Sequence, residues 1–78
     1  WTMKSVNIML NSINDVKDFV ALVCTCDFDI DLTSGRYVVD AKSIMGIFSL
    51  DLSKPIKLEA HTDDDSDPFF NQLKKYEV

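Results

Sequence analysis

A serine stands at the start of a short apolar segment in the middle of the chain. Ser43 precedes apolar residues at helical spacing, which predicts a short amphipathic helix beginning at this serine. Its hydroxyl can accept a hydrogen bond from a backbone N–H of the first helical turn, so Ser43 is a natural N-cap. A phosphate on the same oxygen would meet free N–H groups and the positive end of the helix dipole. Ser43 is therefore a candidate phosphorylation switch, and the alternative is a plain structural cap.

The segment after Ser43 carries more apolar surface than a short helix can bury. Ile44, Ile47 and Phe48 fall at positions i, i+3 and i+4, so they share one side of the predicted helix. Met45 widens the apolar surface. We therefore expect some of these side chains to be exposed, although all of them facing the core is the alternative.

This stretch resembles a known family. The run Lys42-Ser43-Ile44-Met45-Gly46, followed by Ser49-Leu50, is similar to the regulatory segment of HPr. HPr is the histidine-containing phosphocarrier of the bacterial sugar phosphotransferase system. Upstream, Asp29-Ile30-Asp31-Leu32 and the polar turn after it resemble the HPr strand and hairpin that precede this segment. The resemblance is close over residues 28–50 and continues in element order to the C-terminus.

The resemblance implies a regulatory role for Ser43. In HPr proteins of some bacteria the matching serine is phosphorylated by a dedicated HPr kinase, and the product binds a transcriptional regulator. Ile44, Met45 and Phe48 match the apolar patch that HPr proteins present to their partners. The implied partners are therefore proteins: an HPr kinase, a transcriptional regulator or phosphotransferase components.

The chain departs from HPr where the phosphoryl group is carried. The family has a histidine in a Gly-Ile-His-Ala-Arg-Pro-Ala type motif that opens its first helix. In the corresponding residues 11–18, Ile13 lines up and Asn14 stands at the histidine position. The helix-starting proline and the arginine are missing, although Lys17 is nearby. An amide has no titratable nitrogen and cannot take a phosphoryl group as imidazole does, so neither phosphocarrier chemistry nor catalysis is expected here.

Composition excludes several functions. The 78 residues predict one domain over residues 1–78. A net charge of −5 disfavours nucleic acid and anionic membrane surfaces as partners. No membrane span or signal peptide is predicted. Cys24 and Cys26 are too few for a metal site and suit a reducing cytosol, so we expect a cytoplasmic protein without metal or cofactor.

The hydrophobic pattern predicts an α+β fold. Strands are expected at residues 5–10, 28–32, 37–40 and 56–61, and helices at 15–26 with Asn14 as N-cap, after Ser43, and from Pro68 to about Tyr76. The order β-α-β-β-α-β-α predicts an open-faced β-sandwich, a four-stranded antiparallel sheet with three helices on one face. A ferredoxin-like fold shares most of this order, and the HPr resemblance decides between the two.

Two other groups of residues invite chemistry. His61 is the sole histidine, so it is the only imidazole that could replace the missing phosphoryl acceptor. The pattern places it on the solvent face, beside Asp63, Asp64 and Asp65. We expect an ordinary surface histidine. The acidic run 63–67 lacks the spacing of a calcium loop and is expected to be a solvated turn that caps the last helix at Asp67.

The sequence thus predicts an HPr-like regulatory or adaptor domain that acts through protein contacts around Ser43. Two alternatives remain. The chain could be an active phosphocarrier in sugar uptake with an atypical acceptor, or a general interaction domain unrelated to sugar transport.

Overall fold

The predicted order of elements is confirmed. A computed structural model describes residues 4–62 and 68–78. The elements are β1 Lys4–Ile8, α1 Ile13–Val23, β2 Ile30–Ser34, β3 Tyr37–Asp40, α2 Ile44–Phe48, β4 Ile56–Ala60 and α3 Pro68–Leu73, with the 3₁₀ turn η1 at Lys74–Tyr76.

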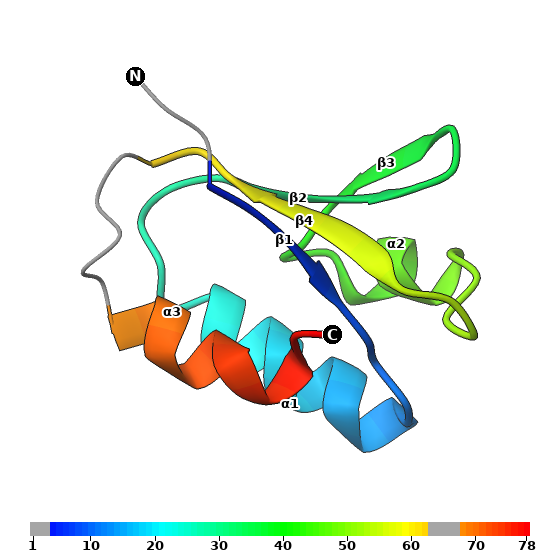
Figure 1. Ribbon diagram of the computed structural model, residues 1–78, viewed down its shortest axis with the longest axis horizontal. Coiled ribbons are helices and arrows are strands. Elements are labelled where there is room, and N and C mark those ends of the chain that lie inside the picture. The colour runs from blue at the N-terminus through cyan, green and yellow to red at the C-terminus, as the bar shows by residue number, and fades with distance from the viewer. Residues whose placement is uncertain (1–3, 63–67) are drawn as a thin grey trace.

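The strands form one antiparallel sheet in the order β1-β4-β2-β3 within the described residues. The three helices of the described residues lie on one face of this sheet (Figure 1). Here the last strand, β4, lies between β1 and β2, a place that the third strand takes in a ferredoxin-like fold. The strand order therefore confirms the open-faced β-sandwich.

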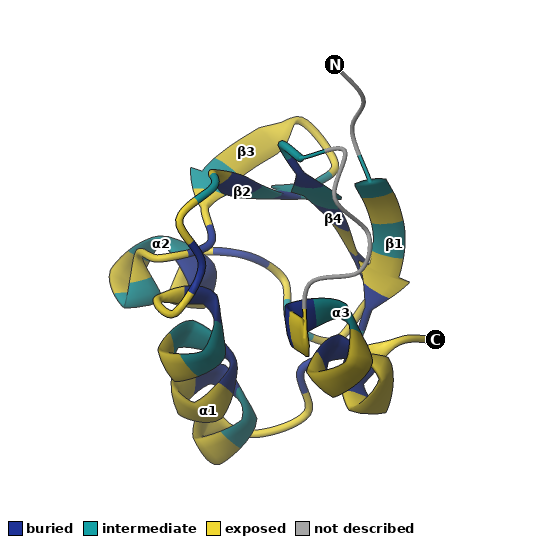
Figure 2. Cartoon of the chain, turned by 90° about the vertical axis from the view of Figure 1, so that its left-hand side faces the viewer, coloured by how far each residue is buried: buried dark blue, intermediate teal, exposed yellow. Residues whose placement is uncertain are grey.

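The core lies between the sheet and the helices. Ile56, Leu58 and Ala60 are fully buried, because alternate residues of β4 face the helical layer. Leu58 sits opposite Leu32 of β2, which is also fully buried. The helices contribute Val16, Phe19 and Val23 from α1 and Phe69 and Leu73 from α3. Figure 2 shows this buried layer between the elements, with the exposed sides turned outward.

Helix α1 begins earlier than predicted, and its cap is not Asn14. Ser12 is the N-cap, because its Oγ accepts a hydrogen bond from the Asp15 N–H at 3.1 Å. The Asp15 carboxylate in turn accepts from the Asn11 N–H at 3.1 Å, so side chain and backbone satisfy each other reciprocally. Asn14 lies inside the first turn and is exposed.

Helix α1 also ends earlier than predicted, at Val23 instead of near Cys26. The N–H groups of Thr25 and Cys26 donate three residues back, to Leu22 and Val23, which tightens the chain into a turn. The Thr25 hydroxyl donates to the same Leu22 carbonyl at 2.6 Å. Cys24 is consequently exposed and Cys26 buried.

The first two strands differ from the prediction at both ends, since β1 is Lys4–Ile8 and β2 is Ile30–Ser34. The second strand begins at Ile30, and Phe28 lies in the preceding loop, where its ring stacks on Phe70 at 6.2 Å between centroids. The first strand ends at Ile8, beyond which the Met9 N–H donates to the Tyr76 carbonyl at 2.8 Å. The predicted cap Asp67 and the acidic run before it lie outside the described residues.

Candidate functional site

Ser43 is an exposed N-cap, as predicted. Its Oγ accepts a hydrogen bond from the Gly46 N–H at 3.2 Å. A tight turn at the end of β3 places it there. The Asp40 carbonyl accepts from the Ser43 N–H at 3.0 Å, and the Asp40 carboxylate accepts from the Lys42 N–H at 2.9 Å. Backbone contacts on both sides therefore hold the Ser43 hydroxyl in place while it remains open to solvent.

Gly46 allows α2 to pack closely on Ser43. A Cβ atom at position 46 would lie 3.2 Å from the Ser43 Oγ and 3.3 Å from the Val39 Cβ. Both distances are shorter than ordinary contacts between carbon or oxygen atoms. A larger residue at this position would push against the cap, so Gly46 contributes to the geometry of Ser43.

The apolar side chains of α2 divide between core and solvent. Ile47 is fully buried and anchors the helix, while Ile44 is half-buried against the core. Met45 is 76% exposed and Phe48 is 40% exposed. Of the three residues predicted to form a partner surface, Met45 and Phe48 are therefore exposed, and Ile44 is available only in part.

A groove of about 420 Å³ joins α2 to the start of α1. The residues that line it are Leu10, Asn11, Ser12, Ile13, Phe48, Leu52 and Ser53. Ile13 is 63% exposed, so the exposed apolar side chains continue from α2 onto the start of α1. The sequence pattern did not predict this. A large apolar residue directly after an N-cap serine was the local signal for it. We call Ile13, Met45 and Phe48 the apolar surface.

The loop after α2 carries a negative charge beside this groove. Asp51 accepts hydrogen bonds from the Ser53 hydroxyl at 2.5 Å and from the Ser53 N–H at 3.0 Å. These bonds, together with Lys54 4.0 Å away, lower the pKa of the Asp51 carboxyl below its ordinary value. The carboxylate therefore stays ionised to lower pH, and Ser53 is held at the rim of the groove.

His61 is not the ordinary surface histidine that the sequence predicted. Its Nε2 lies 2.8 Å from the Asp31 Oδ2, and its side chain is 27% exposed. Asp31 belongs to β2, which pairs with β4 just before His61. The pair is thus a cross-strand contact, which the sequence analysis missed because β2 and β4 are far apart in the chain.

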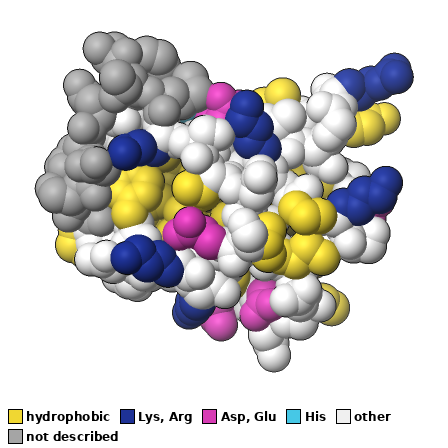
Figure 3. All heavy atoms as spheres, in the orientation of Figure 1, with side chains coloured by type: hydrophobic (Ala, Val, Ile, Leu, Met, Phe, Trp, Pro, Cys, Tyr) yellow, Lys and Arg dark blue, Asp and Glu magenta, His cyan; other side chains and the backbone are white. Residues whose placement is uncertain are grey.

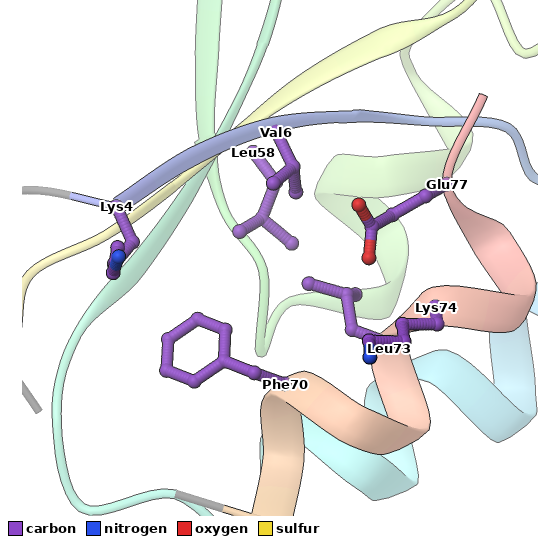
Figure 4. A pocket seen from close by; sticks show the side chains of 7 residues that line it. All are labelled: Lys4, Val6, Leu58, Phe70, Leu73, Lys74 and Glu77. Carbon is purple, nitrogen blue, oxygen red and sulfur yellow. The ribbon is translucent and has the colours of Figure 1, made fainter. Parts of the chain in front are cut away.

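A second hollow, of about 260 Å³, lies between β1 and α3 (Figure 4). It is lined by Lys4, Val6, Leu58, Phe70, Leu73, Lys74 and Glu77. Figure 3 shows apolar side chains flanked by basic and acidic ones on this side of the molecule. It shares no lining residue with the groove beside Phe48, so the two are separate features.

Within residues 4–62 and 68–78, no three His, Cys, Asp or Glu side chains are grouped so that they could hold a metal ion. None of the helices in the same residues is long and apolar enough to cross a membrane.

Comparison with solved structures identifies the fold. No protein-family model and no curated protein matches the chain. A structure of HPr-C-His from Thermoanaerobacter tengcongensis superposes with a TM-score of 0.73 and 26% identity, covering 96% of this chain and 89% of that one. The chain has an HPr-like fold.

A second HPr-like neighbour agrees over almost the full length. The phosphocarrier protein HPr from Bacillus anthracis has a TM-score of 0.71 and 25% identity, with 99% of this chain and 96% of that chain covered. The predicted HPr-like architecture is thereby confirmed.

Proposed function

We propose that this HPr-like chain is a regulatory or adaptor protein related to the bacterial phosphotransferase system, acting through protein contacts around Ser43. The fold supports the relation to phosphotransferase proteins, because both neighbours are HPr proteins and one is described as a phosphocarrier. The supporting observation is that Ser43 and the exposed Met45 and Phe48 lie on one short helix. A modification at Ser43 would therefore act directly on the apolar surface.

Electrostatics explain how such a switch would work. A phosphoserine carries about −1.5 to −2 charges at neutral pH. At Ser43 this charge would stand two residues from Met45 and beside Lys42, whose Nζ donates to the Cys26 carbonyl at 3.3 Å. A partner that buries Met45 would then have to desolvate a phosphate, unless it offers a cation. We infer that unmodified and phosphorylated forms would select different partners.

Asn14 supports a regulatory role more than a carrier role. Asn14 lies exposed in the first turn of α1. The resemblance of residues 11–18 to HPr implies that this is the position of the phosphoryl acceptor in HPr proteins. The Asn14 amide offers no nucleophilic nitrogen. We propose that the groove beside Phe48 contacts proteins without receiving a phosphoryl group.

Incubation with phosphoenolpyruvate and the general phosphotransferase donor enzyme is expected to leave this chain without an acid-labile adduct. The physical reason is the absence of an imidazole at Asn14. Intact mass spectrometry before and after acid treatment measures the result, with a histidine-bearing HPr as positive control. A stoichiometric acid-labile adduct that disappears in His61→Ala would instead support an active carrier with an atypical acceptor.

Met45→Asp is expected to weaken binding of a regulatory partner at least about tenfold, which corresponds to about 1.4 kcal/mol. A charge placed among apolar anchors must be desolvated when the complex forms. The fold should be unaffected, because Met45 is 76% exposed. Isothermal titration calorimetry measures the change, with the Ser43-phosphorylated chain titrated against the transcriptional regulator.

The matched control for that experiment is Val78→Asp. Val78 is 71% exposed, so it receives the same charge at similar exposure but far along the chain from α2. Binding should be unchanged in this variant. Equal binding of Met45→Asp and the original chain, with loss in Val78→Asp, would place the partner surface elsewhere.

A further inference from the structure

Strand β3 is an uncovered edge of the sheet. It pairs with β2 on one side, and in the described part of the chain no strand pairs with its other side (Figure 1). The opposite edge differs. There the C-terminus lies along β1, with a bridge between Ile8 and Glu77 and a hydrogen bond from the Val78 N–H to the Asn7 carbonyl at 3.1 Å. Open edges can pair with another strand.

The register shows which backbone groups of β3 point outward. The Ala41 N–H donates to the Ile30 carbonyl at 2.9 Å, so these two residues form a hydrogen-bonded pair. Hydrogen-bonded and non-hydrogen-bonded pairs alternate along an antiparallel ladder. Val38, opposite Thr33, therefore belongs to a non-hydrogen-bonded pair. Its N–H and carbonyl point away from β2, toward the open edge.

The side chains of this edge are exposed and apolar in the middle. Val38 is 63% exposed and Tyr37 is 67% exposed. Gly35, with φ of 62°, makes the two-residue turn with Arg36 that leads into the strand. Val38 and Asp40 are alternate residues of β3, so they share one face, and Arg36 stands in the turn two positions before Val38. A positive charge, an apolar residue and a negative charge thus follow one another at equal spacing.

This arrangement is complementary to itself. In an antiparallel pair of two β3 strands centred on Val38, each Val38 lies opposite the other. Arg36 of one copy then lies opposite Asp40 of the second copy, twice by symmetry. In the described ranges, no ion pair involves Arg36 or Asp40 within one copy. The two Val38 residues would also exchange their outward N–H and carbonyl groups.

We propose that the open edge of β3 binds the same edge of a second copy of this chain, forming a two-fold symmetric dimer with one continuous sheet. The proposal does not rest on the function proposed for Ser43. Four residues bury little surface, and each copy carries a net charge of −5, which opposes association. We therefore expect a weak, concentration-dependent dimer with a dissociation constant on the order of 0.1 to 1 mM.

A charge-reversal pair tests the register. Arg36→Glu alone and Asp40→Lys alone each place like charges opposite one another, so each variant should be monomeric by sedimentation equilibrium. An equimolar mixture restores both opposite-charge pairs and should associate at least as well as the original chain. Lys17→Glu, which changes the charge by the same amount and sign as Arg36→Glu but at an exposed site on α1, should leave the dimer intact.

Val38→Pro provides a second test that does not depend on charge. Proline removes the outward N–H, which makes no hydrogen bond to β2, so the chain should fold and the dimer should be lost. This variant and Arg36→Glu also decide the question if Asp40→Lys disturbs the turn that Asp40 holds before Ser43. A monomeric original chain at millimolar concentration, or a dimer that survives both Arg36→Glu and Val38→Pro, would overturn the proposal.

Discussion

Ser43→Ala is expected to abolish phosphorylation of this chain by an HPr kinase completely, because alanine has no oxygen to accept the phosphoryl group. The loss of the cap should cost only about 1 kcal/mol of folding free energy. The helix should therefore remain, since Ile47 still anchors it in the core. Intact mass spectrometry after incubation with the kinase and a nucleoside triphosphate measures the added phosphoryl group. An adduct that is stable to acid is phosphoserine, because phosphohistidine is hydrolysed by acid.

Ser49→Ala is the matched control for this result. Ser49 is exposed at the other end of the same helix, and its hydroxyl donates to the Gly46 carbonyl at 2.5 Å. It offers the kinase a similar hydroxyl in a different position. Label that survives in Ser43→Ala but disappears in Ser49→Ala would show that Ser49, at the C-terminal end of α2, is modified and that Ser43 is not.

Phe19→Ala is expected to destabilise the protein by about 3 to 5 kcal/mol, the largest change in stability that we predict. Phe19 is fully buried, and its ring meets Tyr76 edge-on with 5.7 Å between centroids. The substitution therefore leaves a cavity and detaches α1 from the C-terminal turn. Small domains have a total stability of about 5 to 15 kcal/mol, so this substitution should remove a large share of the stability of the protein. Urea denaturation followed by circular dichroism measures the difference.

Ile13→Ala on the same helix is the comparison. Ile13 is 63% exposed, and its truncation should change stability by less than about 0.5 kcal/mol. Equal destabilisation of both variants would mean that the side of α1 that contains Phe19 does not face the core. Ile13→Ala should still weaken partner binding, because the residue belongs to the apolar surface.

Local sequence determined the order of the elements and much of the candidate site. The alternation of Ile56, Leu58 and Ala60 predicted β4, and the apolar spacing after Ser43 predicted α2 with its cap. These features depend on residues within a few positions of each other. The start of α1 was ambiguous even locally, because Ser12 and Asn14 can both cap a helix. The reciprocal bond between Asp15 and the Asn11 N–H favours Ser12.

Only the tertiary structure decided which distant segments meet. The strand order puts β4 beside β2, and this brings His61 to Asp31 across thirty positions of sequence. The packing of α2 beside the start of α1 makes the groove between Ile13 and Phe48. The placement of β3 at the edge leaves its outward backbone groups unpaired within the described residues. Residue patterns specify which face of an element is buried, but the partner of that face depends on how the whole chain fills one core.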